Sequence, residues 1–200
     1  MGCWKKESES EDMSVEKWFI SDMHFGHRNI VKFESNDGRP VRPWNDVDEM
    51  DEALVDNWNA VVRPNDIVFV LGDVVINKKM LPIVDRLFGR KRLIMGNHDM
   101  AHTSEFMKYF EKIYGALELK MGEGDYILSH IPLALQQKER FFANIHGHMH
   151  SYQMEDPWYV SVCVEQTNYA PMHMDHVRQI AKYNIRKDRE LRKNASWKKE

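Results

Sequence analysis

The chain has 200 residues, of which 42% are hydrophobic and 30% charged, and its formal net charge is −3 at pH 7. This composition is typical of a globular domain, and no run approaches the ~18 apolar residues of a membrane span, which excludes an integral membrane protein. Two cysteines, Cys3 and Cys163, are too few for a disulfide framework or a cysteine-rich zinc site. We expect a cytoplasmic protein, because the polar N-terminus also lacks the apolar core of a signal peptide.

Charge is distributed unevenly along the chain. Residues 178–200 contain nine Lys or Arg and three Asp or Glu, so this segment carries a net charge of +6 and the remainder −9. A generally basic nucleic-acid-binding protein is therefore disfavoured. The basic segment is expected to form a solvated terminal helix, with contact to phosphates as the alternative.

Three segments are expected along the chain. Residues 1–14 are charged and almost without aliphatic side chains, which predicts a disordered leader. Residues 15–177 are expected to form the folded domain, and residues 178–200 a basic C-terminal helix or tail. No repeat or linker interrupts the middle segment.

The middle segment repeats one local pattern, in which a short apolar run ends in a polar cluster. Apolar runs of this length are typical of strands that are buried on both faces. The five runs and the polar residues after them are 18–20 with Asp22 and His24, 66–71 with Asp73, 92–95 with Asn97 and His98, 126–128 with His130, and 143–145 with His148 and His150.

Helical patterns separate several of these strands. A helix is predicted after a cap at Asn45 or Asp46, because apolar residues then recur at three- and four-residue spacing until Pro64. Further helices are predicted over 77–88, over 104–113 and from Val177 onward. Residues 117–121 and 126–128 predict a hairpin, and residues 159–164 another strand. The whole pattern predicts an α/β fold.

The polar residues after the strands form one chemically coherent set. Ligands of open α/β sheets bind beyond the carboxyl ends of the strands, so these residues are expected to meet at one site. Residues two apart in an extended chain point the same way, which pairs Asp22 with His24 and His148 with His150. Imidazole, carboxylate and amide groups are ligands for divalent metal ions. A single Gly-Asp after a strand is often only a turn, but five clusters at five strand ends favour a metal site.

The order of these motifs resembles the signature of the calcineurin-like metallophosphoesterases. The motifs are Asp-x-His, Gly-Asp, Gly-Asn-His-Asp, a single His and Gly-His-x-His, and they span Asp22 to His150. Residues 21–30, together with Arg42-Pro43-Trp44, look like the small stand-alone phosphoesterases of bacteria and phages. The resemblance implies a four-layer αββα sandwich, in which two mixed β-sheets pack face to face with helices outside.

The resemblance also implies a site for two divalent metal ions per chain. The implied ligands are Asp22, His24 and His150 for the first ion, Asn97, His130 and His148 for the second, and Asp73 as a bridge between both. Such a pair of ions generates a nucleophile from water and polarises the phosphoryl oxygens. Manganese is the first expectation, and iron, zinc, nickel or cobalt also fit these ligands.

Further roles are expected around the metal ions. The resemblance makes His98 the general acid that protonates the leaving oxygen. Asp99 is expected to orient the His98 ring, with a helix N-cap as the alternative. His27 and Arg28 are candidates for lining the substrate site, with a surface loop as the alternative. His146 is expected to pack behind the ligands instead of binding metal.

Three functions are compatible with these residues. The first is a metal-dependent phosphoesterase that slightly prefers diesters, with nucleotides and nucleic acids among its candidate substrates. Protein phosphatases of this family carry arginines beside the second and third motifs, whereas residues 74–77 and 93–95 here contain none, which disfavours a dianionic monoester. The alternative is that Arg28 or Arg140 supplies this charge from elsewhere in the chain. The second is a nuclease or RNA-processing enzyme that holds its strand with residues 178–200. The third, a metal-binding scaffold, is disfavoured because every ligand and His98 are present. The oligomeric state is left open.

Overall fold

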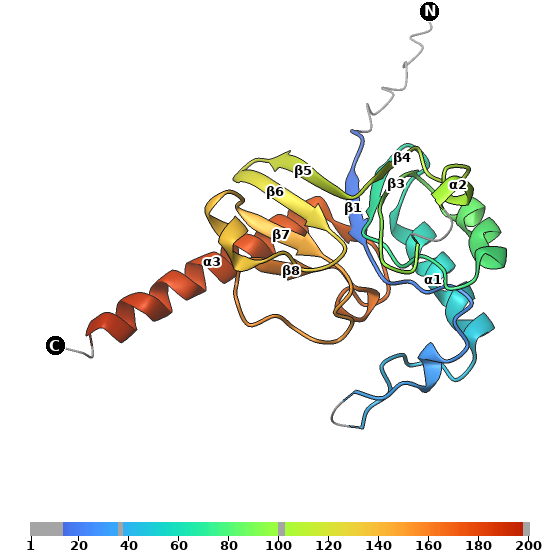
Figure 1. Cartoon of the computed structure of the whole chain (residues 1–200), viewed down its shortest axis with the longest axis horizontal. Helices are drawn as coiled ribbons and strands as arrows, with labels where there is room; N and C mark the ends of the chain where they lie inside the picture. Colours follow the sequence, from blue (N-terminus) through green and yellow to red (C-terminus); the bar gives the residue numbers. More distant parts are fainter. Residues whose placement is uncertain (1–13, 36–37, 100–102, 198–200) are drawn as a thin grey trace, which may run out of the picture.

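The computed structural model describes residues 14–35, 38–99 and 103–197. Its strands form two mixed sheets; in Figure 1, β1 to β4 of the first run from blue to green, and β5 to β8 of the second from yellow to orange. This confirms the predicted α/β class with two mixed sheets. The leader predicted over residues 1–14 lies outside the described residues, except for Ser14.

The first sheet has five strands in the order β4-β3-β2-β1-β9. Strands β1 to β4 run parallel, and β9 is antiparallel to β1. The bounds are β1 Lys17–Ile20, β2 Ile67–Val70, β3 Arg90–Ile94, β4 Lys112–Tyr114 and β9 Met172–His173. Ile20 pairs with Val70, and Val70 with Leu93, so β1, β2 and β3 end at the same edge of the sheet.

The second sheet has four strands in the order β5-β6-β7-β8. The predicted hairpin is present as the antiparallel pair β5 and β6, and β6, β7 and β8 run parallel. The bounds are β5 Ala116–Met121, β6 Gly124–Ser129, β7 Ala143–His146 and β8 Tyr159–Ser161. The strand predicted over 159–164 is shorter than expected, because the chain enters the 3-10 helix η5 at Val164–Gln166.

Two hydrophobic clusters hold these layers together. One cluster joins both sheets and includes Phe19 and Phe69 from the first and Leu128 and Ile145 from the second. The other lies on the opposite face of the first sheet, where Ile20 packs with the helical side chains. Phe19 and Ile20 belong to different clusters because successive strand residues point to opposite faces. The sheets therefore pack face to face, as predicted.

Helix α1 (Val47–Val61) covers the outer face of the first sheet and matches the predicted helix. Asp46 caps it, because its carboxylate accepts hydrogen bonds from the backbone N–H groups of Asp48 and Glu49. Met50, Leu54 and Trp58 of the predicted apolar face lie in the cluster on that side of the sheet, whereas Val61 in the last turn is exposed. The cap and the apolar period were therefore sufficient to locate this helix.

Two predicted helices have a different form in the structure. The segment predicted over 77–88 is the 3-10 helix η2 (Lys78–Arg86), which contains Pro82, a residue without a backbone N–H to donate. The segment predicted over 104–113 has only the short helix α2 (Thr103–Phe106). Its later residues leave the helical path because Lys112–Tyr114 pairs with β3 as strand β4. Further 3-10 helices among the described residues are η1 (Ile30–Lys32) and η4 (Leu135–Glu139).

Helix α3 (Met174–Trp197) continues across the expected domain boundary between residues 177 and 178. Val177 and Ala181 are buried in the cluster that joins both sheets, so the first turns of α3 belong to the core. The rest of α3 extends away from the sheets in Figure 1. Within the described residues, no helix is both long and apolar enough to cross a membrane.

Candidate metal centre

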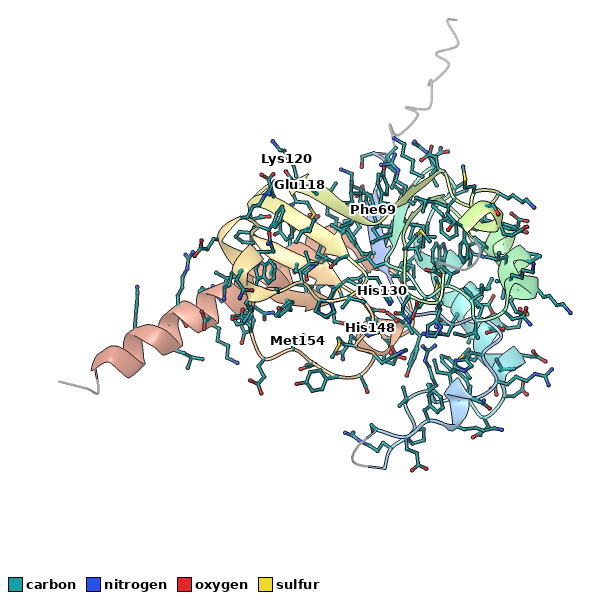
Figure 2. The ribbon with its side chains drawn as sticks, in the orientation of Figure 1. Phe69, Glu118, Lys120, His130, His148 and Met154 are labelled. Carbon is teal, nitrogen blue, oxygen red and sulfur yellow. The ribbon has the colours of Figure 1, made fainter. Side chains whose placement is uncertain are left out.

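The structure brings the predicted ligands from both sheets to one place. Asp22 and Asp73 follow β1 and β2, whereas His130 and His148 follow β6 and β7. The backbone N–H of Asp22 donates to the Gly72 carbonyl at 3.1 Å, which joins the first two loops. The backbone N–H of His148 donates to Asp22 Oδ2 at 2.8 Å, which joins the two sheets. In Figure 2 the labelled His130 and His148 lie close together, and their ring nitrogens are 3.3 Å apart.

The backbone at these ligands is unusual. Five of the predicted ligands have positive φ, a conformation that residues other than glycine rarely adopt. They are Asp22, His24, Asp73, His148 and His150, with φ values of 60°, 51°, 52°, 68° and 48°. Strained backbone of this kind is concentrated at functional sites.

A glycine allows the loops to approach closely at the centre. A Cβ atom at Gly96 would lie 2.2 Å from Asp73 Oδ1, so only glycine fits beside this carboxylate. The missing side chain lets the third loop lie directly against Asp73.

Two groups of potential metal ligands result. Asp22, His24 and His150 form the first, and Asp73, His130 and His148 the second, with ligand atoms within 4.8 Å of one another in each group. Asn97 extends the second group, because its Oδ1 lies 3.0 Å from His130 Nε2.

Asp73 lies between the two groups. Its Oδ2 is 3.6 Å from His24 Nε2 in the first group and 3.4 Å from His130 Nε2 in the second. A carboxylate in this position can bind a cation on either side. The geometry therefore has the form of a bridged pair of cation sites.

Buried atoms without partners show that the groups suit a cation. Asp22 Oδ1 and both ring nitrogens of His24 are buried and have no hydrogen-bond partner. His130 Nδ1 lies 2.7 Å from the Leu71 carbonyl, which can only accept, so in the neutral ring that a cation needs the proton is on Nδ1 and the lone pair is on Nε2. That lone pair faces Asn97 Oδ1, another acceptor. Converging oxygen and nitrogen acceptors are what a divalent cation requires.

The electrostatics of the centre favour ionised carboxylates. Burial acts to raise the pKa of Asp22, but nearby His24, His130 and His150 hold it below its usual range. The pKa of Asp73 is also lowered overall, despite its burial, by His130 and by the backbone N–H of His98. Both carboxylates are therefore available as anionic ligands.

His98 lies at the rim of the centre instead of inside it. Its side chain is 49% exposed, and its Nε2 is 3.9 Å from Asp73 Oδ2. The ring centroid is 5.6 Å from that of His24, and the His98 backbone N–H donates to Asp73 Oδ1 at 3.0 Å. His98 is thus next to the ligands and still open to a bound molecule.

The structure gives Asp99 different partners from the predicted ones. Its carboxylate is fully buried and accepts three backbone hydrogen bonds, from Asp73 at 2.8 Å, Val74 at 3.2 Å and Gly96 at 2.9 Å. Both oxygens are therefore committed to the second and third loops, and the expected role of orienting the His98 ring is wrong. The helix that Asp99 was alternatively expected to cap would begin at residues 100–102, which lie outside the described residues. The position of Asp99 instead fixes the backbone that carries Asp73.

His27 and Arg28 lie in the loop after His24 but differ in exposure. The His27 ring packs 5.7 Å from the His24 ring, and its Nδ1 is buried without a partner. Burial, with the charges of His24 and His98, lowers the pKa of His27. Arg28 is exposed. Their predicted contact with substrate stays a prediction. His146 is fully buried, and its expected packing role stays a prediction.

Two buried charged residues behind the first group were not predicted as site residues. Arg42 has a fully buried side chain that donates to the Asp22 carbonyl at 2.6 Å. Glu165 accepts from His150 Nδ1 at 2.9 Å. Arg42 belongs to the Arg42-Pro43-Trp44 motif, which carried a resemblance to small phosphoesterases but no predicted role. Glu165 lies in none of the strand-end motifs. The sequence therefore gave no direct signal for the role of either residue.

Comparison with known proteins identifies the class of this fold and site. The model of the calcineurin-like phosphoesterase family matches residues 17–200. The chain belongs to this family of metal-dependent phosphoester hydrolases.

Individual relatives are small proteins of archaea, bacteria and phages. An uncharacterized protein of Methanocaldococcus jannaschii is 33% identical over 175 residues, which cover 82% of this chain and 90% of that protein. The gene 66 protein of Mycobacterium phage L5 is 30% identical over 166 residues, covering 67% of this chain and 77% of that protein. A solved protein of unknown function from Aquifex aeolicus is 26% identical, with a TM-score of 0.69, and covers 84% of this chain and 100% of that one.

Proposed function

We propose that this protein is a phosphodiesterase that uses two divalent metal ions. The observation that carries the proposal is the position of the Asp73 carboxylate between two groups of buried ligands. The first ion would be held by Asp22, His24 and His150, and the second by Asn97, His130 and His148, with Asp73 shared. When bound, two such ions generate a nucleophile from water near neutral pH and neutralise charge on the phosphoryl oxygens. Of the metals that fit these ligands, manganese is the one we expect.

His98 is the proposed proton donor. Its exposed ring stands beside the two ligand groups, where the leaving oxygen of a bound ester can reach it. The hydrogen bond from its backbone to Asp73 holds the residue at this position. Protonation of the leaving oxygen by His98 then removes the need to expel an alkoxide.

A hollow beside the centre is the proposed place for the organic part of the substrate. It has a volume of about 620 Å³, and its lining includes Met149 and Ser151, which flank His150, and Tyr152. Tyr152 is 54% exposed, so its ring is available for contact with a ligand. A diester has two organic groups, and a hollow of this size next to the ligands can hold one of them.

The charge around the centre supports a diester over a monoester. The nearest buried guanidinium, that of Arg42, already donates to the Asp22 and Met23 carbonyls and to Glu165. It is therefore not free to clamp a dianionic phosphate in the bidentate manner that favours monoesters.

Helix α3 supports a second candidate, a nuclease. Arg186, Lys187 and Arg189 are exposed on the part of α3 that extends from the sheets. A basic surface of this kind can attract the phosphates of a nucleic acid. The location proposed for either activity is the cytoplasm, and the buried free thiol of Cys163 is compatible with a reducing compartment.

One comparison of substrates tests the proposal. Manganese-loaded protein should show a higher kcat/KM for bis-p-nitrophenyl phosphate than for p-nitrophenyl phosphate. A monoester advantage of about tenfold, equivalent to about 1.4 kcal/mol of transition-state free energy, would contradict the diester preference. Single-stranded RNA belongs in the same assay. Its cleavage, if it weakens steeply as salt is added, would favour the nuclease.

A further inference from the structure

A buried ion pair lies directly behind the first group of ligands. The Glu165 side chain is 2% exposed and the Arg42 side chain 0%, and Arg42 Nη2 lies 2.8 Å from Glu165 Oε1. Arg42 Nε donates to the same oxygen at 2.9 Å. Such a pair is costly to desolvate and weak as a source of stability, so its contacts with the site point to another role.

Glu165 contacts one ligand of the first group directly. His150 Nδ1 donates to Glu165 Oε1 at 2.9 Å, which leaves the lone pair on His150 Nε2. That nitrogen faces the first group, 4.0 Å from Asp22 Oδ1. A carboxylate behind a histidine both fixes its tautomer and makes the imidazole a stronger metal ligand.

Arg42 contacts the other end of the same group. It donates to the backbone carbonyls of Asp22 at 2.6 Å and Met23 at 3.2 Å. One guanidinium therefore ties the loop that carries Asp22 and His24 to the carboxylate that holds His150. The pair thus contacts the backbone of Asp22 and Met23, next to His24, and the ring of His150.

The second group has a weaker partner in the corresponding place. His130 Nδ1 donates to the backbone carbonyl of Leu71 at 2.7 Å, which is a neutral acceptor. The two groups thus share similar ligand atoms but differ in the charge that supports one of their histidines.

We infer that Glu165 and Arg42 are positioning residues that make the group of Asp22, His24 and His150 the tighter of the two cation sites, so that it fills first. This inference rests on the proposed two-metal site. Loss of the carboxylate should weaken the first site by about 10–100-fold, the usual effect of removing a hydrogen-bond partner behind a metal ligand.

Calorimetric titration of metal-free protein with Mn²⁺ tests the inference, because it measures affinity without hydrolysis. Glu165→Gln is examined in two backgrounds that each cripple one site. In His148→Ala, which leaves the first group complete, we expect Glu165→Gln to lower Mn²⁺ affinity by about 10–100-fold. In His24→Ala, which leaves the second group complete, the same change should have little effect.

Glu52→Gln is the matched control, because Glu52 also pairs with an arginine, Arg86, but does so on the surface. It should leave both affinities unchanged. Where Glu165→Gln alone fails to fold, Arg42→Gln with Glu165→Gln removes both buried charges and should weaken the first site in the same way. Equal losses in the two backgrounds, or none in either, would overturn the inference. Either of these results would leave the proposed function untouched, because that function is tested by diester hydrolysis of the wild type.

Discussion

Several residues at this centre have a strained backbone conformation, which contacts elsewhere in the fold must stabilise. Positive φ at a residue other than glycine costs about 1–3 kcal/mol, and five ligands adopt it. Buried contacts impose this backbone, including the three hydrogen bonds that Asp99 accepts near Asp73. The strain aims the side chains of Asp22 and His24 at one point, where bound cations would compensate for it.

His98→Ala tests the residue proposed as proton donor. We expect the variant to retain its metal ions, because His98 lies at the rim and outside both ligand groups. Its kcat should fall by roughly 10²–10⁴-fold on an alkyl ester, the usual contribution of a general acid. The loss should be smaller on a nitrophenyl ester, whose leaving group needs little protonation. Measuring kcat on both esters gives the two losses.

His176→Ala is the control for this substitution, because His176 is exposed on α3 and outside the centre. It should leave kcat unchanged on both esters. An equal loss for His98→Ala on good and poor leaving groups would argue against proton donation and in favour of electrostatic stabilisation.

At the scale of elements, α1 both closes the core and supports the first loop of the site. Asp51 points inward from α1 and is 3% exposed. Its Oδ1 and Oδ2 accept from the backbone N–H of Gly26 at 3.2 and 2.9 Å. Burial, with the charges of Asp48 and Glu52, raises the pKa of Asp51 to about 7. The helix therefore holds the loop after His24 through a carboxyl group that is uncharged in mildly acidic solution.

This raised pKa predicts a pH dependence of stability. The folded state binds the Asp51 proton more tightly than the unfolded chain, whose aspartate has a pKa near 3.8. The stabilising contribution is therefore complete below about pH 4 and is lost as the pH rises to about 7. Asp51→Asn keeps an acceptor for Gly26 and has no charge to bury. Relative to this variant, the wild type should lose a few kcal/mol of unfolding free energy between pH 4 and pH 8.

Urea unfolding of metal-free protein across this pH range measures the difference. Asp56→Asn, an exposed change on the same helix, should follow the wild type at every pH. A constant difference between wild type and Asp51→Asn from pH 4 to pH 8 would show that Asp51 is ionised throughout.

The elements that the sequence predicts well are those determined by local pattern. Helix α1 follows from its cap and its apolar spacing, and β1 from a short buried run before a polar cluster. Strand β4 was missed because its pairing with β3 is a non-local contact, which the helical pattern predicted over 104–113 does not reveal. Secondary structure that depends on a partner strand is not encoded in the segment alone.

In the site, too, the residues in local motifs were predicted, whereas contacts between residues far apart in the chain were not. All seven predicted ligands lie in strand-end motifs, and the structure brings them together. Asp99 was assigned the wrong partner because its motif does not reveal that the backbone of Asp73 folds over it. Arg42 and Glu165 are 123 positions apart in the chain, so only the fold shows that they meet.

At the scale of the whole molecule, neither sheet contains a complete centre. The first contributes Asp22, His24 and Asp73, and the second contributes His130 and the residues after β7, so packing of the two sheets and assembly of the site are one event. Helix α3 strengthens this packing, because Arg178 pairs with Glu123 at the β5–β6 turn and Ala181 lies in the shared core. The first residues of the basic segment, from residue 178, therefore pack against the folded domain, and its later residues extend away from it (Figure 1).

The central claim is that one carboxylate, Asp73, joins two cation sites. The most direct measurement is the number of manganese ions per chain, with the rate of diester hydrolysis, in wild type and Asp73→Asn. We predict two ions and hydrolysis in the wild type, and loss of metal from both groups with loss of hydrolysis in Asp73→Asn, because Asp73 Oδ2 lies within 3.6 Å of a histidine in each group. Full occupancy and unchanged hydrolysis in Asp73→Asn would contradict the claim.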